Sequence, residues 1–125
     1  MRIFTDIRCL QDDSYEERGV GSHAHFLLKA IRSQLNFDTE IIGLSDPDIG
    51  PLHPSHAGLC DSIRPTFHVG NLREPSLFLQ LSPMTHDTRL PAMLLDRPGI
   101  IPLAVTYDFI PLRFSNRYLN KKHLL

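Results

Sequence analysis

The chain has 125 residues, of which 42% are hydrophobic and 22% charged, and its formal net charge is −1. This length suits one domain with one hydrophobic core. The balanced charge argues against a nucleic-acid partner, which usually needs a basic face. The segment Met1–Asp6 meets a charge too early for a signal peptide, and no apolar run reaches the ~20 residues that span a membrane. These features predict a cytoplasmic protein with reduced thiols.

The N-terminal part of the chain predicts a strand, a loop and a helix. Residues 2–10 are rich in β-branched and apolar side chains, which favour a strand. The polar residues 11–18 predict a loop that Gly19-Val20-Gly21 closes. A helix is then predicted with Ser22 as its N-cap and Asn36 at its C-terminal end. Its apolar positions follow helical spacing: Ala24, Leu27, Leu28, Ile31 and Leu35.

The middle of the chain predicts strands separated by a long loop. Residues 39–44 predict a second strand. Residues 46–65 contain four prolines and two glycines, which predict a loop with a short helix near residues 56–63. Two further strands are predicted at residues 66–69 and 76–81.

The C-terminal part continues the alternation of helices and strands. Residues 88–96 predict a helix with Pro91 in its first turn, where proline is tolerated. Residues 100–106 form a continuous apolar run, which is typical of a strand buried on both faces. A last helix is predicted with Ser115 as its N-cap. The alternation predicts an α/β domain with a Rossmann-like, mostly parallel sheet flanked by helices.

Ligands of such sheets bind beyond the C-terminal ends of the strands, where three candidate features fall. Gly19-Val20-Gly21-Ser22 predicts a phosphate- or hydroxyl-binding loop before a helix N-terminus, with a plain tight turn as the alternative. Tyr107-Asp108 follows the apolar run, and Asp108 either faces a cleft or caps a turn. Ser82 either donates a hydrogen bond to a ligand or only terminates a strand.

The seven histidines raise the question of a metal site. His53 and His56 lie near Cys60 and Asp61, but their spacing matches no familiar zinc pattern, so no metal is predicted. His23 lies in the first predicted helical turn and either lines the cleft or is a surface histidine. A disulfide between Cys9 and Cys60 is not expected in a reducing compartment.

Two segments together resemble the N-terminal domain of bacterial GT-B glycosyltransferases of family 4, group 1. MRIFTDIRCLQDDSYEERGVGSHAHFLLKAI resembles the opening of these proteins, in which a strand, a polar loop and Gly-Ile/Val-Gly precede an amphipathic helix. PGIIPLAVTYDFIPLRFSNRYL resembles their later buried strand and the His/Tyr-Asp-hydrophobic-Ile-Pro-Leu motif that follows it. LFLQLSP also lies where the family has a strand. The likeness runs from residue 1 to about residue 119, with a loose middle at residues 45–75.

The resemblance implies a retaining transfer of a sugar from a nucleotide diphosphate sugar to a glycan or lipid-linked acceptor, with no metal or other cofactor. In the family, this domain mainly holds the acceptor, and its glycine loop, here Gly19 and Gly21, faces the donor diphosphate. The pair at the end of the later strand matches Tyr107-Asp108. Many members have histidine where this chain has Tyr107, which leaves a catalytic role for that residue open.

The family also implies a second domain, which binds the nucleotide sugar and is absent from residues 1–125. We therefore expect an acceptor-side domain of an enzyme of polysaccharide biosynthesis that does not catalyse transfer by itself. Self-association through an exposed domain face and a peripheral location at the inner face of the membrane are further expectations. The alternative is a stand-alone α/β binding or interaction module that works with another chain.

Overall fold

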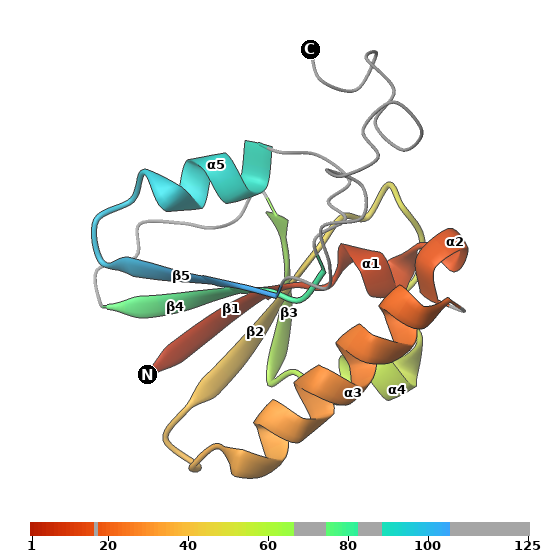
Figure 1. The fold of residues 1–125 in the computed structure, drawn as a ribbon, viewed down its shortest axis with the longest axis horizontal. Coiled ribbons are helices and arrows are strands. Elements are labelled where there is room, and N and C mark those ends of the chain that lie inside the picture. Colours follow the sequence, from red (N-terminus) through yellow and green to blue (C-terminus); the bar gives the residue numbers. More distant parts are fainter. Residues whose placement is uncertain (17, 67–74, 83–88, 106–125) are drawn as a thin grey trace, which may run out of the picture.

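The computed structural model describes residues 1–16, 18–66, 75–82 and 89–105, which form a single α/β sandwich (Figure 1). Five strands pair in parallel in the order β3-β2-β1-β4-β5. The strands are β1 (Arg2–Asp6), β2 (Glu40–Ser45), β3 (Ser62–Pro65), β4 (Ser76–Gln80) and β5 (Ile100–Ala104). The helices are α1 (Arg8–Gln11), α2 (Asp13–Glu16), α3 (Gly19–Gln34), α4 (Pro54–Ala57) and α5 (Arg89–Leu95). The predicted Rossmann-like class is confirmed.

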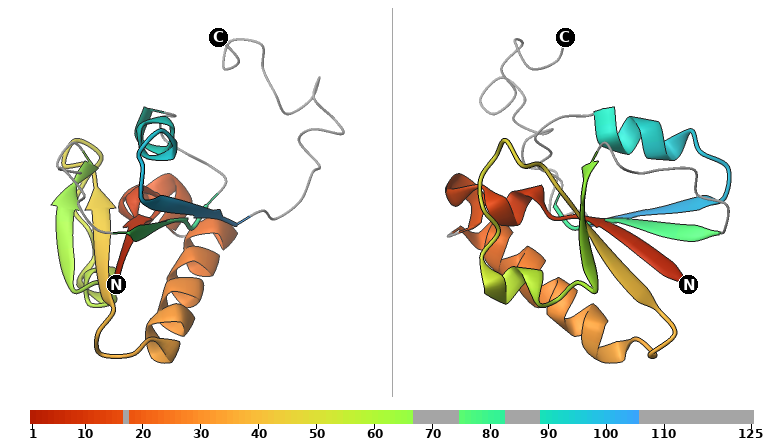
Figure 2. Two further views of the ribbon diagram at one scale, coloured as in Figure 1. Left: turned by 90° about the vertical axis from the view of Figure 1, so that its left-hand side faces the viewer. Right: turned by 180° about the vertical axis from the view of Figure 1, so that it is seen from behind.

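Helices cover both faces of the sheet (Figure 2). On one face, α3 packs Ala24 and Leu28 into a cluster with strand residues such as Ile3. On the other face, α5 packs Leu90 and Leu94 into a second cluster. Successive residues of a strand point to opposite faces, so the central strands supply both clusters. In the part of the chain that the structure describes, no helix is long and apolar enough to cross a membrane.

The first strand is shorter than predicted, because the chain turns after Asp6. The Asp6 carboxylate accepts a hydrogen bond from the backbone N–H of Arg8, and the Leu10 N–H donates to the carbonyl of Ile7. The apolar residues after Asp6 are therefore buried by a helical turn, α1, rather than by a longer strand. The predicted polar loop likewise contains α2, which Asp12 starts by accepting the N–H of Ser14.

Helix α3 begins at Gly19, so Gly19-Val20-Gly21-Ser22 forms its first turn and not a loop before it. Arg18 is the N-cap, and the prediction of Ser22 as N-cap is wrong. Gly21 is buried under α2: a Cβ there would lie 2.3 Å from the Glu16 carbonyl oxygen. The absent side chain at Gly21 lets the chain start α3 directly after α2. The helix ends at Gln34, two residues before Asn36.

The predicted second strand is confirmed as β2, the strand at residues 76–81 as β4 and the helix at residues 88–96 as α5. The predicted long loop holds its short helix, α4, earlier than predicted, and the loop prediction is wrong at residues 62–65, which form β3. Strand β3 ends at Pro65, so the prediction of a strand at residues 66–69 is wrong at Thr66. Residues 67–69 and the predicted C-terminal helix lie outside the described residues.

Strand β5 lies where predicted but is not buried on both faces, since it pairs only with β4 and stands at an edge of the sheet. The side chains of Ile101 and Leu103 are 56% and 47% exposed. Ser76 donates to the Gly99 carbonyl and Val105 donates to the Gln80 carbonyl at the two ends of the ladder. In a parallel ladder alternate residues face the partner strand, so the nitrogen of Pro102 faces the free edge.

The two glycines of α3 give opposite predictions for substitution by alanine. A Cβ added at Gly19 would meet nothing within 4 Å, and the residue has no positive φ. Gly19→Ala should therefore raise the free energy of unfolding by about 0.5 kcal/mol, since it restricts the unfolded chain. Gly21→Ala should lower it by about 2 kcal/mol or more, because its Cβ meets the backbone of α2. Urea unfolding of both variants checks the pair, and equal effects would contradict the packing described for Gly21.

Candidate functional site

The C-terminal ends of β1 and β4 form the topological switch point of the sheet. From β1 the chain passes through α3 to β2 on one side, and from β4 it passes through α5 to β5 on the other. The two crossover helices cover opposite faces (Figure 2). Open parallel sheets bind ligands where the strand order diverges in this way. The ends of β1 and β4 are therefore the candidate site.

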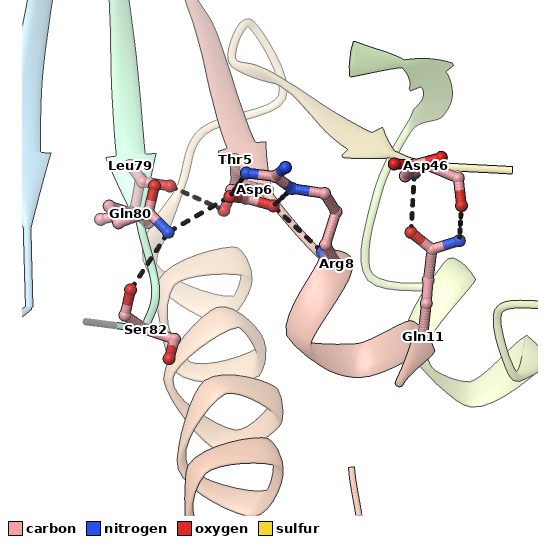
Figure 3. A network of polar contacts seen from close by, with 8 residues as sticks. All are labelled: Thr5, Asp6, Arg8, Gln11, Asp46, Leu79, Gln80 and Ser82. Carbon is pink, nitrogen blue, oxygen red and sulfur yellow. Dashed lines mark hydrogen bonds and ion pairs between the residues drawn. The ribbon is translucent and has the colours of Figure 1, made fainter. Parts of the chain in front are cut away.

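A buried ion pair lies at the end of β1 (Figure 3). The Arg8 guanidinium donates from Nε to Asp6 Oδ1 at 2.9 Å and from Nη2 to Asp6 Oδ2 at 2.8 Å. The two side chains are only 1% and 4% exposed. Two charges at this depth persist because the bidentate geometry satisfies them mutually. The pair fixes how the chain leaves the central strand.

Gln80, at the end of β4, joins this ion pair to the neighbouring strand (Figure 3). Its Nε2 donates to Asp6 Oδ2 at 3.2 Å and to the Ser82 carbonyl at 3.1 Å. Both partners are acceptors, so the amide orientation is fixed. Among the described residues, the Gln80 Oε1 is a buried oxygen with no hydrogen-bond partner. The site thus holds an oriented acceptor that suits an N–H or O–H donor.

Gln11, at the end of α1, fixes the segment that follows β2 (Figure 3). Its Nε2 donates to the carbonyls of Asp46 at 2.9 Å and Gly50 at 2.8 Å, and its Oε1 accepts the Asp46 N–H at 2.9 Å. Gly50 has a φ of 151°, which favours glycine. The end of β2 is therefore tied to the residues that follow β1.

The N-terminus of α3 lies next to α2, at the same edge of the sheet as the C-terminal end of β1 (Figure 1). The Arg18 side chain makes no capping hydrogen bond to α3, and the first turn of this helix carries no acidic residue. Gly19 is exposed, and a Cβ there would meet open space, so a ligand can approach its backbone. Gly21 is occupied by the contact with α2. Neither glycine has a positive φ, so neither is needed here for a left-handed backbone conformation.

The other predicted site residues are not all brought together. Ser22 and His23 are exposed on the first turns of α3. Ser82 is buried, 1% exposed, beside Gln80. Tyr107 and Asp108 lie outside the described residues. The ligand-binding roles of all these residues stay predictions.

Four polar residues near the strand ends were not singled out from the sequence: Asp6, Arg8, Gln11 and Gln80. We call these four residues the polar network. Asp6 and Arg8 flank the buried Ile7, and two charges within an apolar segment were a signal of burial in a pair. Gln11 and Gln80 gave no such signal, since Gln11 bonds Asp46, which is 35 residues away, and Gln80 bonds Asp6, which is 74 residues away.

The two cysteines are free thiols. Burial, followed by the nearby Asp6 carboxylate, raises the pKa of Cys9 to about 12, and burial followed by Asp61 raises the pKa of Cys60 to about 11. Neither thiol is therefore an activated nucleophile. Within the described residues, no group of three or more His, Cys, Asp or Glu side chains is placed to hold a metal ion.

No protein-family model, curated protein or solved structure matches this chain. The parallel sheet and its flanking helices place it in the Rossmann-like α/β class by fold alone.

Removal of the Arg8 guanidinium should lower the free energy of unfolding far more than removal of a surface guanidinium. Arg8→Met leaves the Asp6 carboxylate buried without its cation, and we expect the free energy of unfolding to fall by about 3–5 kcal/mol. Arg2→Met breaks the exposed pair with Glu40 and should change it by less than about 1 kcal/mol. Urea unfolding measures both, and a similar small loss in the two variants would contradict the structural role of Arg8.

Proposed function

We propose that this chain is the acceptor-side, N-terminal domain of a retaining glycosyltransferase, which moves a sugar from a nucleotide diphosphate sugar to a glycan or lipid-linked acceptor. The observation that carries the proposal is the switch point between β1 and β4, with its polar network and the open N-terminus of α3 on the same side of the sheet. The resemblance of the segments that contain Gly19–Ser22 and Tyr107-Asp108 supplies the choice of reaction. This domain binds no metal or other cofactor in the proposed reaction.

The N-terminus of α3 has the properties of an anion site. A helix of 16 residues carries a partial positive charge and unpaired backbone N–H groups at its start. Arg18 adds a full positive charge at the N-cap, and no carboxylate of the first turn competes with a ligand. The exposed Gly19 allows a diphosphate to reach the N–H groups, as at other phosphate-binding helix termini.

The polar network at the strand ends suits the hydroxyl groups of a sugar. The Asp6 carboxylate is already occupied by Arg8 and Gln80, so it does not act as a free base here. The Gln80 Oε1, by contrast, has no partner among the described residues. A sugar hydroxyl would supply the missing donor, and an unpaired buried acceptor costs about 1–3 kcal/mol while it stays unfilled.

The second candidate is a stand-alone α/β binding or interaction module. The observation that favours it is the apolar surface of β5, where Ile101 and Leu103 remain exposed on the same face of the sheet. Such surface suits contact with another chain. The two candidates differ in whether the N-terminus of α3 binds an anion.

Anion binding is tested by following backbone amide signals in NMR titrations with inorganic pyrophosphate and with uridine, guanosine and adenosine diphosphate sugars. We expect saturable shifts of the Gly19 and Val20 amides. Gly19→Asp should weaken binding at least about tenfold, because its carboxylate occupies the positive end of the helix. Gly19→Ala is the matched control and should bind like the parent chain, since its Cβ meets open space.

Two results would contradict the proposal. One is the absence of shifts at α3, or equal binding by Gly19→Asp and Gly19→Ala, which would favour the interaction module. The other is turnover of a nucleotide sugar by residues 1–125 alone, which would contradict the assignment to the acceptor-side half.

A further inference from the structure

A row of three ionisable side chains joins three helices. His56 of α4 lies between Glu16 of α2 and His25 of α3, and we call these three residues the histidine clasp. His56 Nε2 is 2.9 Å from Glu16 Oε1, and His56 Nδ1 is 2.8 Å from His25 Nδ1. The side chain of His56 is 10% exposed, so water offers it few alternative partners.

The geometry limits how many protons the clasp can hold. The Glu16 carboxylate accepts a hydrogen bond, so His56 Nε2 carries a proton. Only one proton fits between two nitrogens that are 2.8 Å apart, on either His25 or His56. With a further proton on His25 Nε2, the two rings together carry one positive charge. A second charge would put a proton on both Nδ1 atoms, which then face each other as donors and cannot stay in contact.

The charged neighbours also disfavour a proton on His25. Burial first, then His56 and then Lys29, one turn along α3, lower the pKa of His25 below its ordinary value. Among the groups described around the clasp, Glu16 is a carboxylate that offsets a charge on His56 directly. The centroids of the His53 and His56 rings are 6.0 Å apart, so His53 is a further titratable group close to the clasp.

The segment that carries α4 is held at both ends by contacts that are not histidine contacts. At its start, Gln11 bonds the backbone of Asp46 and Gly50. At its end, the Arg32 guanidinium donates to both oxygens of Asp61 at 2.6 and 2.7 Å. This hydrogen bonding to Arg32, and then that to the Ile41 N–H, lowers the pKa of Asp61. The ends of segment 46–61 therefore stay attached in mild acid, while the clasp is a polar link between α4 and the helices α2 and α3.

We propose that the histidine clasp is a pH-sensitive latch, which releases α4 from α2 and α3 in mild acid while both ends of segment 46–61 stay attached. Release uncovers apolar side chains of this segment that pack against the core below α3, namely Leu52, Leu59 and Cys60. The inference does not depend on the glycosyltransferase proposal, because it uses neither the strand ends nor the N-terminal turn of α3.

The direction in which pH changes the stability of the closed latch follows from proton linkage. A histidine whose pKa is lowered in the closed state binds fewer protons there than in the open state. The closed latch is therefore at full stability above the ordinary pKa of 6.5, and it loses stability as the pH falls below that value. One such group, here His25, raises the ratio of open to closed latch by up to about tenfold per pH unit.

The test measures how strongly a neutral gadolinium chelate broadens the backbone amide signals of α4 and residues 58–60 at pH 7.5 and at pH 5. The probe carries no titrating group, so changes report exposure of the segment. We expect stronger broadening at pH 5 in the parent chain. The amide of Ile42, in the central sheet, should not change, and broadening there as well would mean global unfolding and would overturn the latch.

His25→Gln is the decisive variant. A glutamine amide can donate to a neutral His56 or accept from a protonated one, so the contact should survive at both pH values and the response should be lost. His23→Gln, two residues away on the same helix, removes an exposed histidine and should keep the response of the parent chain. A pH response in His25→Gln equal to that of the parent, its loss in His23→Gln, or its absence from the parent would overturn the proposal.

Discussion

The Asp6–Arg8 ion pair is the interaction on which the rest of the site depends. Strand β1 is the centre of the sheet and pairs with β2 and β4 along its whole length. The ion pair ends this strand and turns the chain into α1, and the same carboxylate receives the Gln80 amide from β4. Because the pair is buried, its charges cannot move into water without disruption of the strand ends.

The turn at Asp6 also determines what the glycines of α3 do. It leads through α1 and α2 to a position where the backbone of Glu16 lies against Gly21. The missing side chain of Gly21 suggested that a ligand approaches the backbone there. It is instead required because the backbone of α2 packs against this residue. Gly19, two residues earlier, remains open to solvent. The two positions look equivalent in the sequence, and only the tertiary contact distinguishes them.

Local patterns in the sequence were sufficient for the elements that have one clear periodicity. Helix α3 and strand β4 were predicted within a few residues, since their apolar residues follow helical spacing or a short compact run. The end of the first strand was not predicted correctly, because the apolar residues at positions 7, 9 and 10 fit a longer strand as well as a helical turn. The polar network could not be predicted from local pattern, since Gln80 and Asp6 are 74 residues apart. Exposure of β5 depends on its place at the sheet edge, which single-strand composition does not encode.

That edge also restricts how β5 can be covered. The side chains of Ile101 and Leu103 share a face with Leu77 and Leu79 of β4, to which they are paired. Helix α3 covers this face over the central strands but leaves β5 exposed. Pro102 presents no N–H at the free edge, so another strand cannot complete a regular ladder there. A partner for this surface would therefore pack side chains against the sheet face, as a second domain or a neighbouring chain does, rather than extend the sheet.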